Sequence, residues 1–262
     1  MKDINLLKSI LDREVARINT PAFVTADPVQ FPRRFSSLPD IEIVALLSAT
    51  IAWGNRKMIC NNCEKILNIM GNEPAHFVQS NEYESLPDEL NIHRTFFARN
   101  FKYFLRGLQR IYHSYGSLND FAKTHHVGES EEPAWRLVRL MQQEFAAANS
   151  GTYDSRCLPT HLENTALKRI NMALRWLVRN DGIVDLGVWD AIKPSQLFIP
   201  LDVHVGDTAR QLGMTTRRAN DKKTVLEITQ LLRQMCPNDP IIYDFALFGY
   251  SMYGAGGSSE NE

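Results

Sequence analysis

Apolar residues recur with helical spacing along most of the chain, and this pattern predicts a protein built from α-helices. The windows that carry it are residues 3–18, 40–53, 56–70, 94–113, 117–124, 131–147, 165–180, 203–212, 221–235 and 240–250. Alternating runs typical of half-buried strands are hard to find, and residues 183–192 are expected to hold at most a short extended piece or a 3₁₀ turn. The predicted fold class is therefore all-α.

Residues typical of helix ends support these windows, and the lack of a linker predicts a single domain. Asp40 and Ser117 stand where helix N-caps are expected. There is no internal repeat and no long linker, so residues 1–255 are expected to form a single domain. Residues 20–39, rich in proline and aromatic side chains, are expected to be an ordered loop packed on the surface. Residues 256–262 are expected to be a disordered tail.

Composition is that of an ordinary globular protein. The chain has 262 residues, of which 44% are hydrophobic, and a net charge of −1. No run is apolar enough to cross a bilayer, so we expect a cytoplasmic protein without a membrane partner. We also expect it to be a monomer. The nearly neutral charge argues against bulk attraction of nucleic acid but leaves local patches open.

One basic patch stands out between residues 93 and 112, which contain no acidic side chain. Its five cations are Arg94, Arg99, Lys102, Arg106 and Arg110. The segment either contacts nucleic acid or is a solvated helix face, and the pattern alone leaves both open.

Two of the four cysteines, Cys60 and Cys63, form a CxxC pair. The pair falls inside a helical window, and neither a second close pair nor clustered histidines accompany it. We therefore expect buried or incidental thiols, and no metal or other cofactor.

The window 165–180 carries a second group of cations. Its apolar stripe leaves Lys168, Arg175 and Arg179 on the opposite face, where they suit a phosphate backbone or another anion. A solvated helix face is the alternative. Arg169 and Trp176 lie on a flank, where the guanidinium has the spacing to stack on the indole.

A carboxylate opens the next window. Pro200 fixes the approach of the chain, and Asp202 stands at the N-cap position of the helix 203–212. A capping aspartate needs no further function. However, an amine and a carboxylate brought together at a cleft are the parts needed to break an N-glycosidic bond. The functional question is whether Lys168 and Asp202 meet.

The motifs around both residues resemble those of helix–hairpin–helix DNA glycosylases. PLDVHVGDTARQLGM is similar to the segment that carries the essential aspartate of that superfamily, and IEIVALLSATIAWGN (41–55) is similar to its early helix. The stretch ALKRINMALRWLVR, with its lysine-to-aspartate spacing, is most similar to the archaeal 8-oxoguanine DNA glycosylase branch. Over nearly its full length the chain also resembles a bacterial family of undefined function, through DPVQFPRRF, AWGNRKMI, KRINMALRWLVR, PLDVHV and YDFALFG.

The glycosylase resemblance implies a two-lobed helical bundle with a cleft between the lobes. It implies that duplex DNA is bound with a damaged nucleotide flipped into that cleft, with an oxidised purine such as 8-oxoguanine as the first candidate. Lys168 would be the nucleophile, with its pKa lowered by burial and by Arg169, and Asp202 the catalytic carboxylate. The substrate-contacting residues implied are Thr50, Trp53, Asn55, Arg56, Arg169, Arg175, Trp176, His204, Tyr243 and Phe248.

One departure from the superfamily keeps other functions open. Its hairpin usually carries glycines that let backbone amides approach a phosphate, whereas this chain reads CLPTHLENTALK. A helix N-terminus near Asn164 is then the expected anion site. The retained Lys168 and Asp202 favour a glycosylase with lyase activity. The altered hairpin and neutral charge favour a non-catalytic nucleic-acid-binding protein, or an enzyme of the same fold acting on RNA or a modified nucleoside.

Overall fold

A computed structural model of the chain describes the backbone of residues 3–253 and the side chains of residues 3–250. Its regular structure is almost entirely helical, which confirms the all-α class. The α-helices are α1 (Ile4–Ile18), α2 (Pro21–Ala26), α3 (Leu38–Thr50), α4 (Arg56–Ile69), α5 (Pro74–Ser80), α6 (Ala98–Tyr115), α7 (Leu118–Thr124), α8 (Pro133–Ala148), α9 (Lys168–Val178), α10 (Val203–Gln211), α11 (Lys222–Met235) and α12 (Tyr243–Tyr253). Short 3₁₀ helices are η1 (Pro28–Gln30), η2 (Pro32–Arg34), η3 (Glu82–Ser85), η4 (Val127–Glu129), η5 (Pro194–Gln196) and η6 (Pro240–Ile242).

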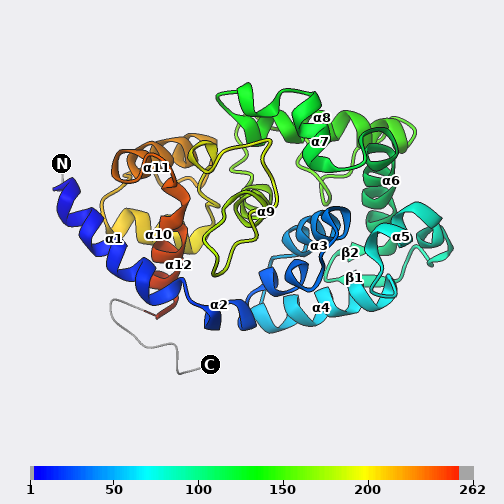
Figure 1. Cartoon of the computed structure of the whole chain (residues 1–262), viewed down its shortest axis with the longest axis horizontal. Coiled ribbons are helices and arrows are strands. Elements are labelled where there is room, and N and C mark those ends of the chain that lie inside the picture. The colour runs from blue at the N-terminus through cyan, green and yellow to red at the C-terminus, as the bar shows by residue number, and fades with distance from the viewer. Residues whose placement is uncertain (1–2, 254–262) are drawn as a thin grey trace.

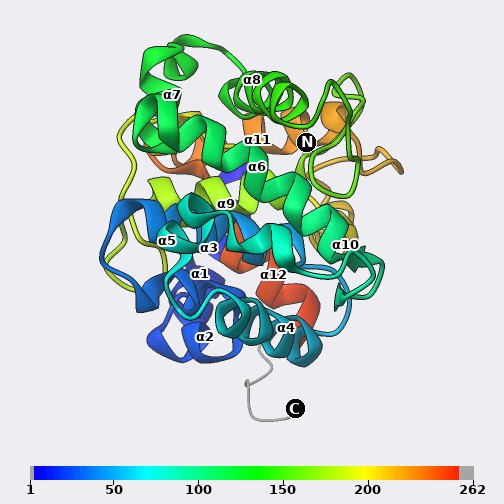
Figure 2. The ribbon, with the colours of Figure 1, turned by 90° about the vertical axis from the view of Figure 1, so that its right-hand side faces the viewer.

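The helices form two groups that α9 joins (Figure 1). In one group α1 packs on α12, which also packs on α10, so that the first and last helices lie side by side. In the other group α6 packs on α8, and both helices face the viewer in Figure 2. Helix α9 packs against α3 of this second group. The residues before and after α9 therefore lie where the two groups meet.

Helix α3 is the most deeply buried element. Every residue from Ile41 to Thr50 is buried, as expected for a helix that is apolar on all sides. Its N-cap is not Asp40, as predicted, but Ser37, whose hydroxyl accepts from the Asp40 amide. The Asp40 carboxylate instead accepts from the backbone of Ala75 at the start of α5. The predicted cap of α7, Ser117, is confirmed.

A two-stranded antiparallel hairpin escaped the sequence pattern. Strand β1 (Asn91–His93) pairs with β2 (Phe96–Phe97). Such short strands leave no readable alternation. Because Arg94 between them has a left-handed φ of 50°, the helix predicted from residue 94 begins only at Ala98.

Short helices also replace predicted loops. Residues 20–39 contain α2, η1 and η2, each beginning at a proline, and α5 was likewise unpredicted. By contrast, residues 183–192 form neither a strand nor a 3₁₀ turn. This segment lies against α9, where the backbone amides of Leu186 and Trp189 donate to carbonyls near the end of the helix. The predicted tail 256–262 lies outside the described residues. None of the described helices has the length and apolarity needed to span a membrane.

Candidate functional site

A cleft of about 1690 Å³ opens where the two helix groups meet. One wall comes from α2, η1 and the turn between α3 and α4. The other comes from the first turns of α9 and α10 and from α12. Both Lys168 and Asp202 line this cleft, so the helix starts that carried the chemical prediction open into one space.

Lys168 is the first residue of α9, and a strained turn places it there. Leu167 before it has φ 52° and ψ 35°, a left-handed conformation unfavourable for a branched side chain. The turn is held because Asn171 donates from its amide to Leu167 O and from its side chain to Ala166 O. Asn164, the expected helix start, lies outside α9. Its carbonyl accepts from Lys222.

Asp202 is the N-cap of α10, as the sequence predicted. One carboxylate oxygen accepts from the Val205 amide at 3.0 Å. The other lies 3.9 Å from Lys168 Nζ, and the two side chains are 28% and 26% exposed. The predicted proximity in a solvent-reachable cleft is thus confirmed, while the catalytic roles of both residues stay a proposal.

Asn220, which no sequence motif singles out, holds the backbone of Asp202 in place. Asn220, in the turn before α11, donates to the Asp202 carbonyl at 3.0 Å and accepts from Arg210 at 3.1 Å. A Cβ atom at Gly206 would lie 2.5 Å from the Asn220 side-chain oxygen, so the glycine makes this contact possible. The α10–α11 turn therefore fixes the backbone of the capping residue Asp202.

Arg175 corrects the prediction of a basic stripe open to phosphate. Its side chain is only 5% exposed and forms ion pairs with Asp185 and Asp244. Asp244, on α12, lines the cleft, and burial raises the pKa of its carboxyl while Arg175 opposes the rise. Arg175 therefore borders the cleft as a neutralised cation.

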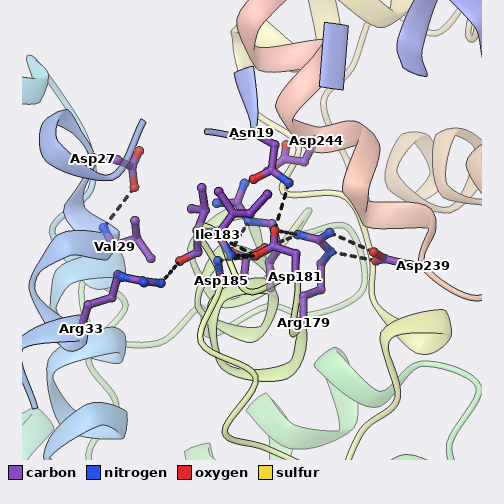
Figure 3. A network of polar contacts seen from close by, with 12 residues as sticks. Asn19, Asp27, Val29, Arg33, Arg179, Asp181, Ile183, Asp185, Asp239 and Asp244 are labelled. Atoms are coloured by element: carbon purple, nitrogen blue, oxygen red, sulfur yellow. Dashed lines mark hydrogen bonds and ion pairs between the residues drawn. The ribbon is translucent and has the colours of Figure 1, made fainter. Parts of the chain in front are cut away.

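Arg179 lies even deeper and is 1% exposed. Figure 3 shows its guanidinium between three carboxylates, those of Asp181, Asp185 and Asp239. The Asp181 carboxylate also accepts three backbone amides of the loop that follows, beginning with that of Ile183. Arg179 thus pins this loop to α9 and does not face a ligand.

Trp53 is held firmly in the cleft wall. Its carbonyl bonds to His93 Nε2 at 3.0 Å, and the two rings meet edge-to-face at 4.6 Å. Burial lowers the pKa of His93, which is fully buried. The Arg169 guanidinium lies 5.6 Å from the Trp53 ring centre, so the expected stacking on Trp176 is wrong. Trp176 is fully buried and outside the cleft.

Other implied contact residues divide into two sets. Thr50 and Tyr243 are buried away from the cleft, where Thr50 O accepts from Arg169 and the Tyr243 hydroxyl donates to Asp12. They are therefore removed from the substrate-contacting set, together with Trp176. The residues that do line the cleft are Trp53, Asn55, Arg56, Arg169, Arg175, His204 and Phe248.

The basic segment around α6 is largely neutralised. Its four cations from Arg99 onward pair with Glu89, Asp88, Glu84 and Glu144 respectively. The exception is Arg94, which packs against Gly54, a residue that lines the cleft. The interpretation of the whole segment as a nucleic-acid contact is therefore not supported by its geometry.

The cysteines are reduced in the described structure. Cys63 is buried, and burial raises the pKa of its thiol to about 12, whereas Cys60 lines the cleft. Among the described residues, no three His, Cys, Asp or Glu side chains gather as a metal site would require.

Residues 27–253 match the model of a family described as a protein of unknown function (DUF2400). The match covers most of the chain, which therefore belongs to this family. Comparisons with curated proteins and with solved structures return no match.

Proposed function

We propose that this protein is a DNA glycosylase of the helix–hairpin–helix type, with abasic-site lyase activity. Its two helix groups would be the lobes, and its substrate a damaged base, with an oxidised purine such as 8-oxoguanine the first candidate. The observation that carries the proposal is the 3.9 Å separation of Lys168 Nζ and the Asp202 carboxylate in a large open cleft. An amine beside a carboxylate is the arrangement that nucleophilic base excision needs.

The reaction follows from these two groups. A nucleotide flipped out of the duplex enters the cleft, and the neutral amine of Lys168 attacks the anomeric carbon of its sugar. The bond from that carbon to the base breaks, and the base leaves with the bonding electrons. Asp202 accepts the proton lost by the amine and stabilises positive charge on the sugar. The aminal then opens to a Schiff base, from which β-elimination cleaves the strand.

Trp53 and Phe248 are the aromatic residues best placed to contact the flipped base. Both line the cleft, and Trp53 is braced by His93. A rigid aromatic face suits stacking of a base extruded from its helix. His204, at the start of α10, borders the same space.

Borohydride trapping tests the proposal. The protein is incubated with duplex carrying 8-oxoguanine, another damaged base or an abasic site, and any Schiff base is reduced to a stable covalent complex. We expect trapping by the wild type and none by Lys168→Gln. Lys223→Gln is the control, because Lys223 is an exposed lysine of α11 outside the cleft and should leave trapping unchanged.

Absence of trapping across a panel of lesions would refute the glycosylase–lyase activity. Salt-dependent duplex binding without trapping would instead identify a non-catalytic DNA-binding protein. Trapping or base release restricted to RNA or to a modified nucleoside would assign the same residues to another substrate.

A further inference from the structure

Cations gather around the turn between α3 and α4, at the cleft wall. Arg56 and Lys57 follow this turn, Arg94 and Arg169 pack against it, and Arg156 lies beside Arg169. We name these five residues, with the turn 52–55, the cationic turn. Within the described side chains, no carboxylate lies within 4.0 Å of any of the five, unlike the paired Arg34 of the same cleft.

Arg169 carries its charge partly buried. One guanidinium nitrogen donates to Thr50 O at the end of α3 and to Arg156 O, at 2.8 and 3.0 Å. Burial lowers the pKa of Arg169, and no carboxylate counteracts this. A guanidinium that is desolvated without a counter-ion gains most from an incoming anion.

Arg56 is held by an aromatic ring instead of by an acid. Its guanidinium lies 5.0 Å from the centre of the Phe248 ring, on the cleft. Its Nη2 is buried and has no hydrogen-bond partner among the described residues. Buried donors are nearly always satisfied, so an unpaired one at a cleft wall points to a missing acceptor.

Arg94 reaches the same turn from the β1–β2 hairpin. A Cβ atom at Gly54 would lie 2.7 Å from Arg94 Nη1, so the glycine, with φ 106°, lets this cation lie against the backbone. Arg94 itself has a left-handed φ of 50°. Two unusual backbone conformations thus bring this charge against Gly54, a residue of the turn that lines the cleft.

We propose that the cationic turn binds backbone phosphates of the DNA strand whose nucleotide enters the cleft. The inference rests on the proposed function, because it takes DNA as the substrate. Guanidinium groups recognise phosphate through paired donors, and Arg169 adjoins Lys168, so a phosphate bound here flanks the reacting sugar. The turn would supply the anchoring that glycine-rich hairpin amides supply elsewhere, since this chain lacks those glycines.

Salt-dependent DNA binding tests this assignment. Binding of duplex carrying a tetrahydrofuran abasic-site analogue is measured by fluorescence anisotropy over a range of salt concentrations. The variants are Arg56→Gln and Arg94→Gln, since neither guanidinium bonds to a described protein acceptor and both variants should fold. Each lost phosphate contact should lower the slope of log K against log salt by about 0.9. Arg99→Gln is the control, because Arg99 is paired with Glu89 outside the cleft.

The outcomes separate this inference from the proposed function. Unchanged slopes in both variants, or no duplex binding by the wild type, would overturn the phosphate site. Tighter binding of the same sequence as RNA would overturn its assignment to DNA. Lys168→Gln should lose trapping yet keep the wild-type slope. Reduced slopes without any trapping by the wild type would retain the phosphate site and reject the glycosylase.

Discussion

At the C-terminal end of α9, Arg175 and Arg179 are buried and bound to carboxylates, whereas at its N-terminal end Lys168 and Arg169 border the cleft. Arg169 has no carboxylate within 4.0 Å among the described residues, and Lys168 meets Asp202 only at 3.9 Å. One end of the helix uses its cations to hold the fold together. The other end leaves its cations without close carboxylates, so that they can bind an anion. Whether a cation is neutralised by a carboxylate therefore identifies the site better than the number of basic residues does.

Removing the charge at the buried end should have the largest effect. Arg179→Met leaves Asp181 and Asp239 without a cation and Asp185 with Arg175 alone, and should lower the free energy of unfolding by about 3–5 kcal/mol. Urea denaturation measures it. Arg110→Ala, at an exposed ion pair, is the control and should cost less than about 1 kcal/mol. Equal costs in the two variants would remove the distinction between structural and available cations.

A buried carboxylate that has no ion pair among the described residues separates burial from charge pairing more sharply than Arg179 does. Glu42 of α3 accepts from the Leu118 and Asn119 amides, Tyr112 and Trp189, and burial raises its pKa to about 7 while these donors oppose the rise. In Glu42→Gln, an NH2 group replaces one carboxylate oxygen and faces groups that are themselves hydrogen-bond donors. The variant should lower the free energy of unfolding by about 1–3 kcal/mol.

The matched variant for Glu42 is Tyr112→Phe, which removes a single donor to the carboxylate. It should cost about 1 kcal/mol in the same urea measurement. A Glu42→Gln variant as stable as the wild type would mean that the four donors do not require two acceptor oxygens there.

Low pH should destabilise the fold through protonation of His93, which packs against Trp53 in the cleft wall. Because burial lowers the pKa of His93, the folded protein binds fewer protons there than the unfolded chain does. This contribution is fully present above the ordinary histidine pKa of about 6.5 and is lost as pH falls below it. Unfolding midpoints of wild type and His93→Gln, compared from pH 8 to 5, should show less acid loss in the variant. Parallel profiles would contradict a neutral His93 beneath Trp53.

The smallest effect on stability is expected at the site itself. Lys168→Gln removes a partly exposed, widely spaced ion pair, and should change the free energy of unfolding by less than about 1 kcal/mol. Its measured denaturation curve should overlay that of the wild type, even though trapping is lost. A large destabilisation would place Lys168 with Arg179, as a structural cation.

Sequence patterns located the long helices and the N-cap of α10, because both signals are local. Periodic apolar residues define α9, and Asp202 caps α10 with the expected geometry. Patterns could not tell a solvated basic face from a buried one, since the carboxylates that neutralise Arg179 include that of the distant Asp239. Nor do His93 and Asn220 carry a local signal. Their partners, Trp53 and Asp202, lie far away in the sequence.

The contact of α1 with α12 has a consequence for how the chain folds. Tyr243 of α12 donates to Asp12 of α1 at 2.9 Å, across almost the whole length of the sequence. Contacts of such separation slow folding, because a long loop must close before they form. During synthesis, α1 leaves the ribosome long before its packing partner exists. Its apolar face stays without this partner until α12 emerges, and the wall of the cleft that contains Asp244 is completed only then.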